Sequence, residues 1–132
     1  MQKDIGSCSV DDIAIVLSCP VLAVHKNRKD IIIYGGAVHL SADHSRFNNR
    51  TPYYGLVVDI NENGWGKPIE KTYVRKLSQD LGIIHTLDEN FLKRIKPGHK
   101  LGVLPVHSCL SADNMNYYYT IEGEKLEKMN EK

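Results

Sequence analysis

His107 and Cys109 are the residues of this sequence whose types and spacing point most directly to chemistry, and they follow an apolar run at residues 101–106. Side chains two positions apart on a β-strand point to the same face, so this imidazole and this thiolate can approach one metal ion. Both groups are good zinc ligands, and two protein ligands leave positions open for water or substrate, as in a catalytic zinc site. The same spacing also fits a buried cysteine beside a hydrogen-bonded histidine, so both interpretations stay open.

Other polar residues give weaker signals. Cys109 with His107 as its base would form a nucleophile, but no Asn or Asp is identifiable that would orient the imidazole. Four further histidines are isolated in the sequence and are interpreted as structural or surface residues: His39, His44, His85 and His99. A basic cluster in the second half of the chain is interpreted as a solvated face: Lys93, Arg94, Lys96 and Lys100.

A calcium-loop pattern occurs in the middle of the chain. The run from Asp59 to Glu70 matches the EF-hand loop at every defined position. An EF-hand requires a helix on each side, whereas the residues before Asp59 are typical of a strand and Pro68 interrupts the exit. The context therefore favours a plain hairpin turn at Asn63-Gly64.

The composition is that of one ordinary globular domain. The 132 residues include 17 Lys+Arg and 16 Asp+Glu, for a formal net charge of +1, and 42% of the residues are hydrophobic. These values exclude a disordered, coiled-coil or collagen-like protein and allow a core without disulfides. The chain has no basic face for nucleic acid, and its apolar runs are far shorter than the roughly 20 residues that span a bilayer. Since the N-terminus has no secretory signal and the three cysteines are irregularly spaced, we expect a cytoplasmic protein with reduced thiols.

Short strand-like segments separated by turn residues dominate the chain. They lie at residues 13–24, 31–34, 54–60, 73–77, 83–87, 101–106, 117–121 and 125–129. Pro20, within the first segment, predicts a bulge or an edge strand. Residues 26–30 form the turn of a first hairpin, and Gly35-Gly36 allows the chain to bend before residues 37–40.

Two short helices are predicted. Ser9 with Asp12 is a weak capping box that supports no more than one turn. Thr86 with Glu89 is a second capping box, followed by apolar residues at helical spacing and by Pro97-Gly98 as the stop. The predicted fold class is therefore mainly β. We expect an antiparallel β-barrel or sandwich of about seven or eight strands with one or two short helices, in a single domain that covers residues 1–132.

Four segments of the chain resemble the C-terminal domain of D-serine dehydratase-like proteins. They are GSCSVDDIA at residues 6–14, YGGAVHLS at 34–41, YGLV at 54–57 and LPVHSC at 104–109, with Met115 and Tyr118 beyond. Together with the D-threonine aldolases, that group belongs to the alanine-racemase-like class of pyridoxal-phosphate (PLP) enzymes. The resemblance extends from about Gly6 to Glu124, and the His-x-Cys element is its most specific part.

The resemblance implies an active site that is shared with a second domain. In that family a (β/α) barrel carries PLP on a lysine and a C-terminal β-domain covers the active site. The His-x-Cys pair binds zinc in the dehydratases, whereas the aldolases use His-x-Asp. His107 and Cys109 are thereby implied as zinc ligands near the hydroxyl and carboxylate of the substrate, where a Lewis acid helps hydroxide to leave once PLP has stabilised the α-carbanion. Cysteine at the second position favours zinc and the dehydratase type.

The chain departs from the family pattern at two points. The family often has an acidic residue followed by His-Gly after the middle strand, whereas residues 79–82 read Gln-Asp-Leu-Gly, so no role is carried over to that position. The (β/α) barrel, which needs about 200 residues or more, does not fit in this chain. No Schiff-base lysine, catalytic residue or cofactor-binding residue is therefore identified here.

We expect the β-domain of a PLP-dependent D-amino-acid lyase, of the D-serine dehydratase, aldolase or racemase-like type, which contributes a zinc site and is inactive alone. The expected partners are the PLP-binding barrel, as an upstream segment or a separate subunit, a D-amino-acid substrate and a second copy in a homodimer. The alternative is a stand-alone β-module that binds a metal or a small ligand without catalysis.

Overall fold

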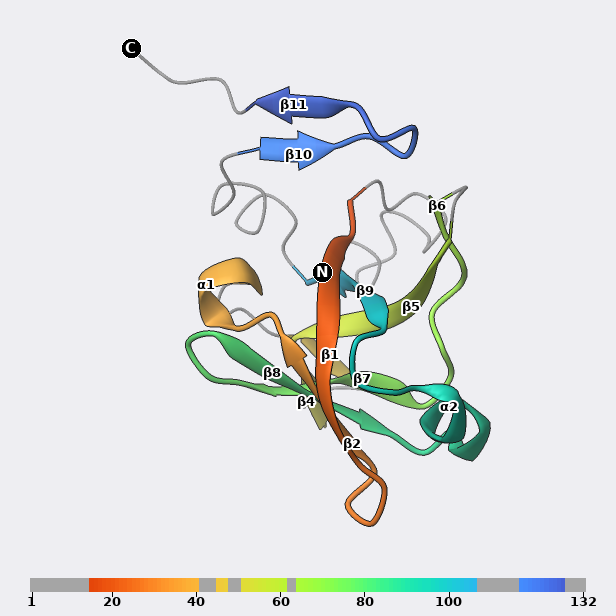
Figure 1. Ribbon diagram of the computed structural model, residues 1–132. Helices are drawn as coiled ribbons and strands as arrows, with labels where there is room; N and C mark the ends of the chain where they lie inside the picture. The colour runs from red at the N-terminus through yellow and green to blue at the C-terminus, as the bar shows by residue number, and fades with distance from the viewer. Residues whose placement is uncertain (1–14, 41–44, 48–50, 62–63, 107–116, 128–132) are drawn as a thin grey trace.

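The structure of the chain, a computed structural model, describes residues 15–40, 45–47, 51–61, 64–106 and 117–127 (Figure 1). Eleven strands and two short helices lie within these ranges. Their bounds are β1 Leu17–His25, β2 Asp30–Tyr34, α1 Ala37–Leu40, β3 Ser45–Phe47, β4 Thr51–Tyr53, β5 Gly55–Asn61, β6 Gly64–Trp65, β7 Thr72–Leu77, β8 Leu81–Thr86, α2 Glu89–Arg94, β9 Lys100–Pro105, β10 Tyr117–Tyr119 and β11 Lys125–Glu127.

Six of these strands close into an antiparallel barrel. The strand order is β6-β5-β7-β8-β2-β1-β9, and β9 pairs with β5 as well as with β1. Because β9 returns to β5, the ring β5-β7-β8-β2-β1-β9 is closed, and β6 is a short additional strand on β5 (Figure 1). The predicted fold class, a mainly β barrel or sandwich with short helices, is confirmed, and closure of the ring makes it a barrel.

The barrel is filled with β-branched side chains from neighbouring strands. Ile31 and Ile33 of β2, Val74 of β7, Ile84 of β8 and Val103 of β9 are fully buried and belong to one hydrophobic cluster. Since successive side chains on a strand face opposite ways, the residues between them point away from this cluster. Burial of these apolar side chains is the main source of stability for a domain of this size.

β1 contains the irregularity that Pro20 predicted. The pairing of β1 with β2 shifts register between Val21 and Ala23, so Leu22 is the extra residue of a bulge. β1 is not an edge strand, because it pairs with β2 on one side and with β9 on the other. Pro20 forms the last pair of the β1–β9 ladder, opposite Lys100, close to the bulge, where a strand tolerates proline.

Helix α2 begins two residues later than the predicted capping box. Asp88 is its N-cap, and the Asp88 carboxylate accepts a hydrogen bond from the Phe91 N–H at 3.0 Å. Thr86 instead ends β8 as a fully buried residue, with its hydroxyl 2.7 Å from that of Thr72. Burial of Thr86 on the inner face of β8 therefore determines its position, and the cap passes to the next residue with a suitable side chain. Neither described helix is long and apolar enough to span a membrane.

The last described strands form the hairpin that the sequence predicted. β10 and β11 pair antiparallel from Tyr117 opposite Glu127 to Tyr119 opposite Lys125. Gly123 occupies the turn at φ 91°, a left-handed conformation that favours glycine.

Candidate functional site at the exit end of the barrel

One end of the barrel collects the ends of the strands that lead toward the predicted site. Leu17 of β1 lies opposite Val103 of β9, and Gly55 of β5 lies opposite Pro105. β2 runs antiparallel to β1 and therefore ends, at Tyr34, on the same side. We call this the exit end: there β2 and β9 finish and β1, β5 and β8 begin.

β9 supplies a firmly held strand at the exit end. It pairs on both sides, and residues 101–105 are buried. Val106 is also buried, and His107 follows it directly in the sequence. The predicted ligands His107 and Cys109 themselves lie outside the described residues, so the zinc site stays a prediction. Within the described part of the chain, no group of three or more His, Cys, Asp or Glu side chains is placed to hold a metal ion.

Helix α1 packs against the exit end through close backbone contacts. The Ala37 N–H donates to the Ser78 carbonyl oxygen at 2.8 Å, so the start of α1 is tied to the turn between β7 and β8. A Cβ at Gly36 would lie 2.5 Å from the Gln79 carbonyl oxygen, so only glycine allows this approach. At the other end of α1, Leu40 is buried in the same cluster as Val103. Helix α1 therefore lies against this end, beside the end of β2 and the turn between β7 and β8 (Figure 1).

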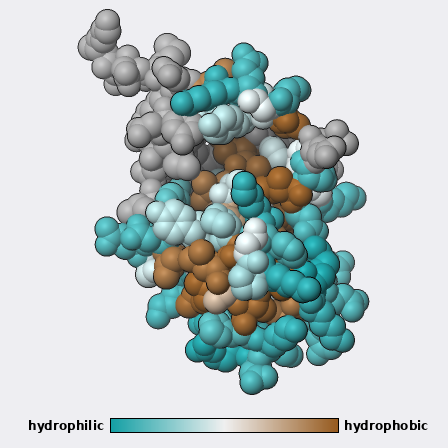
Figure 2. Space-filling model, viewed as in Figure 1, coloured by the Kyte–Doolittle hydropathy of each residue, from teal (hydrophilic) through white to brown (hydrophobic). Residues whose placement is uncertain are grey.

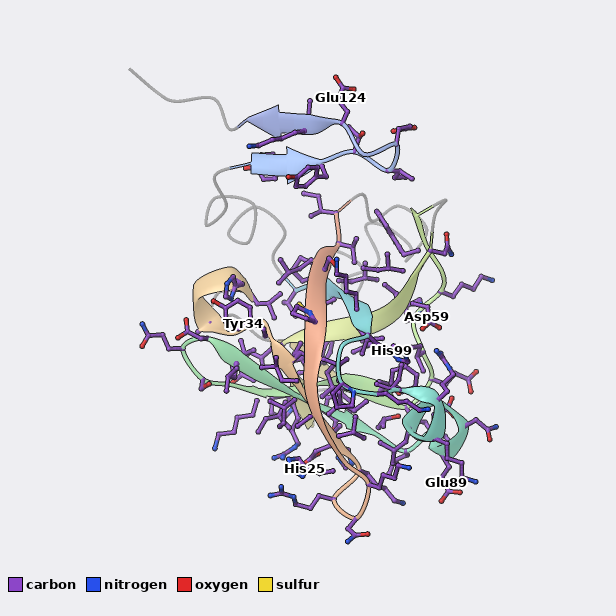
Figure 3. All side chains as sticks on the ribbon, viewed as in Figure 1. His25, Tyr34, Asp59, Glu89, His99 and Glu124 are labelled. Carbon is purple, nitrogen blue, oxygen red and sulfur yellow. The ribbon has the colours of Figure 1, made fainter. Side chains whose placement is uncertain are left out.

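His39 and Tyr34 come together beside α1. The Gly36 N–H donates to His39 Nδ1 at 3.1 Å, and the Tyr34 ring meets the imidazole edge to face with centroids 5.3 Å apart. Figure 3 shows Tyr34 next to α1 at this end. His39, which is isolated in the sequence, was predicted to be a structural or surface residue, and this arrangement was not predicted. The signal available was a histidine three residues after a glycine at a helix start, the spacing at which a side chain reaches back to the first N–H.

Cys19 of β1 faces the core beside this end. It is fully buried, and burial raises its pKa from 9.0 to about 12. Its thiol donates only a weak hydrogen bond, to the Leu17 carbonyl oxygen at 3.8 Å. A thiol that stays protonated and inaccessible is neither a nucleophile nor a metal ligand at neutral pH, so Cys19 is structural.

His85 belongs to a polar network at the opposite end of the barrel. Its Nδ1 lies 3.1 Å from the Asp30 carboxylate, which also accepts a hydrogen bond from Arg75 at 3.0 Å. Asp30 is buried, and the Tyr73 ring packs against the imidazole with centroids 6.0 Å apart. The network links β2, β7 and β8, so the structural interpretation of His85 is confirmed.

The calcium-loop interpretation of Asp59 is not supported. Both carboxylate oxygens of Asp59 accept hydrogen bonds from Arg94, at 3.0 and 2.7 Å, so an ion pair fixes α2 to β5. Asp59 also lies within β5, whereas an EF-hand loop begins at the end of a helix. His99 accepts a hydrogen bond from the Lys96 N–H at 3.2 Å, which fits its interpretation as a surface residue.

The chain matches a protein-family model along most of its length. The model is described as "Putative serine dehydratase domain" and matches residues 14–121. Among curated proteins, the D-serine dehydratase of Dictyostelium discoideum is 24% identical over 129 residues, which are 94% of this chain and 31% of that protein.

The fold also matches solved structures. An alanine-racemase-like protein from Idiomarina loihiensis is 26% identical with a TM-score of 0.80, over 94% of this chain and 33% of that one. A variant of D-threo-3-hydroxyaspartate dehydratase, in its metal-free form, is 19% identical with a TM-score of 0.82, over 98% of this chain and 36% of that one. The chain thus spans about a third of the length of each relative described.

The dehydratase variants carry their substitutions at two chemically informative positions. In the metal-free variant a cysteine is replaced by alanine, and in a second variant of the same enzyme a histidine two positions earlier is replaced by alanine. This histidine and cysteine have the same order and separation as His107 and Cys109.

Proposed function

Because the chain belongs to the serine dehydratase domain family, we propose that it is the C-terminal β-domain of a PLP-dependent D-amino-acid lyase of the D-serine dehydratase type. The observation that carries the proposal is the His-x-Cys pair that directly follows the buried strand β9 at the exit end. A histidine and a cysteine with the same separation are the substituted residues in the D-threo-3-hydroxyaspartate dehydratase variants.

His107 and Cys109 are the residues that would hold zinc. Their donor set of one imidazole nitrogen and one thiolate sulfur fits zinc better than it fits magnesium or calcium, which prefer oxygen ligands. Zinc bound there would act as a Lewis acid on the hydroxyl group that the substrate loses. The contribution of this chain is positional: β9 is paired on both sides and buried, so it fixes the point from which the two ligands extend.

The PLP site belongs to the larger domain in this proposal. The chain spans about a third of its relatives, which leaves ample length in those proteins for a separate cofactor-binding domain. PLP would supply the electron sink that stabilises a carbanion next to the amino group. The β-domain alone lacks this sink, so it is inactive without the larger domain.

An apolar outer surface of the barrel is the surface that we assign to that larger domain. This outer sheet face consists of Leu22, Ile32, Tyr34, Leu81 and Ile83 on β1, β2 and β8. The exposed fractions are 47% for Leu22, 48% for Tyr34 and 38% for Leu81, and hydrophobic surface gathers over these strands in Figure 2. Such a surface is favoured at an interface, and we assign as its occupant the part of the relatives, about two thirds of their length, that this chain does not cover.

Zinc analysis of the pure chain tests the proposed metal site. The wild type should take up zinc, and His107→Ala and Cys109→Ala should each weaken zinc binding about tenfold or more. His99→Ala is the matched control, because it removes an exposed imidazole that precedes β9, whereas the pair follows β9. With cobalt as the probe, Cys109→Ala should also lose the absorption band from thiolate to metal. Equal metal uptake by all four proteins, or none by the wild type, would refute the site.

A further inference from the structure

The imidazole of His39 uses one ring nitrogen for the fold and leaves the other available. The Gly36 N–H donates to Nδ1 at 3.1 Å, and the described residues offer no partner to Nε2. The bond with Gly36 requires the lone pair of Nδ1, so in the neutral ring the proton lies on Nε2. His39 therefore presents an N–H donor at Nε2.

The orientation of this donor is fixed by its surroundings. Gly36 and His39 form the returning half of a capping box, in which a side chain in the first turn accepts from the N–H that precedes the helix. The Tyr34 ring packs against the imidazole at an interplanar angle of 60°. The tie between Ala37 and Ser78 holds the helix itself in place. A donor with so little freedom loses little entropy when it binds a ligand.

The donor lies at the functionally relevant end of the barrel. Tyr34 ends β2 at the exit end, and Leu40, the residue after His39, is buried in the cluster that includes Val103 of β9. The same end of β9 leads to His107 in the sequence. Helix α1, which carries His39, therefore borders the same end of the barrel at which we place a small molecule.

The tautomer excludes His39 from metal binding and points to a different ligand group. A histidine that binds a metal through Nε2 donates its Nδ1–H to an acceptor, whereas Nδ1 of His39 is itself the acceptor. An N–H donor of this kind fits an anionic oxygen, because such hydrogen bonds are strengthened by the charge. We propose that His39, held by Tyr34 and Gly36, donates its Nε2–H to a carboxylate or phosphate oxygen of a small molecule bound at the exit end. The identification with an amino-acid substrate rests on the proposed function.

Two substitutions separate this role from helix capping. His39→Gln and His39→Glu both place an acceptor oxygen where it can cap the Gly36 N–H. Gln also keeps an N–H donor, whereas Glu has none and adds a negative charge. The wild type and both variants are titrated with D-serine, with acetate and with inorganic phosphate, and binding is followed by nuclear magnetic resonance. In wild type labelled with ¹⁵N-histidine, the same spectra report which ring nitrogen of His39 carries the proton.

We expect the proton on Nε2, comparable binding by wild type and His39→Gln, and binding at least about tenfold weaker for His39→Glu, with unchanged stability in urea. Tighter binding of D-serine and acetate identifies a carboxylate, and tighter binding of phosphate identifies a phosphoryl group. A proton on Nδ1, equal binding by His39→Glu, or no binding of any probe to the wild type would overturn the proposal. The titration needs no metal, so a failure of zinc binding in the separate test above would affect the proposed function alone.

Discussion

One added methyl group at Gly35 tests how tightly the exit end is packed. A Cβ on Gly35 would lie 2.7 Å from Cys19 Sγ but 3.6 Å from Cys19 Cβ, which is an ordinary contact. Gly35 is not among the residues with positive φ, so Gly35→Ala adds no backbone strain. The collision with the sulfur atom is therefore the main perturbation, and Cys19→Ala should relieve it.

The expected free energies follow from the crowding and from the space that sulfur leaves. Gly35→Ala should lower the free energy of unfolding by about 1–2 kcal/mol, as overpacking of a filled core does. Cys19→Ala should cost about 1–2 kcal/mol, because it removes a buried atom and leaves a small cavity. In the double variant the new methyl group enters the space of the sulfur. The two costs should therefore not add, and we expect a coupling energy of about 1–2 kcal/mol.

Urea denaturation of the four proteins in this cycle measures the coupling. Gly36→Ala, alone and with Cys19→Ala, is the control, because its Cβ would meet the backbone oxygen of Gln79 at 2.5 Å and removal of the sulfur cannot relieve that clash. The slope of the free energy against urea should stay constant across the series. If the costs of Gly35→Ala and Cys19→Ala add to within about 0.5 kcal/mol, the packing argument is wrong.

Four further predictions concern other parts of the molecule. The raised pKa of Cys19 means that its contribution to stability is complete below about pH 9 and is lost as the pH rises from 9.0 to about 12. In urea titrations at pH 8 to 11, Cys19→Ala should therefore lose less stability with rising pH than the wild type does. Identical slopes of the free energy of unfolding against pH for the two proteins would contradict this prediction. Asp30→Asn should cost about 2 kcal/mol because it weakens a buried network, whereas Asp59→Asn, in an exposed ion pair, should cost less than about 1 kcal/mol in the same assay; the reverse order would refute our assignment of the stronger network. The pure chain with PLP and D-serine should release no pyruvate or ammonia in a coupled assay, and turnover would show that it is a complete enzyme. In a chimera where this chain replaces the matching third of the Dictyostelium D-serine dehydratase, Ile83→Glu should reduce activity, whereas Lys93→Glu, at an exposed position of α2 outside that face, should not; a dimer of the isolated chain that Ile83→Glu dissociates in light scattering would assign the outer sheet face to a second copy instead.

The strands could be predicted because their signals are local. Runs of Ile and Val with turn residues between them identify β2, β5, β8 and β9 without knowledge of their neighbours. Closure of the ring could not be predicted in this way, since it depends on the pairing of β5 with β9, in which Val57 lies opposite Val103 although the two are distant in the sequence. The cap of α2 was misplaced for a related reason: Thr86 fits the local pattern of a cap, but its burial opposite Thr72 is decided by tertiary packing.

In the candidate site, too, contacts between residues close in the sequence could be predicted, whereas contacts between distant residues could not. The hydrogen bond between Gly36 and His39 is local, and the three-residue spacing of a helix cap is sufficient to predict it. The pairing of His85 with Asp30 joins residues that are distant in the sequence, so no local pattern predicts it. For His107 and Cys109 the sequence pattern and the family remain the basis, because both residues lie outside the described ranges.

The strand that closes the barrel, β9, is the last of the six barrel strands in the chain. Until β9 has left the ribosome, the backbone groups of β1 and β5 that pair with it have no partner strand. A chain that stops before Lys100 would expose both edges to other chains, which favours aggregation. The strand that pairs with both edges also leads into His107, so a chain that contains the proposed ligands always contains the closing strand as well. Zinc uptake is therefore expected only from chains that are long enough to include β9.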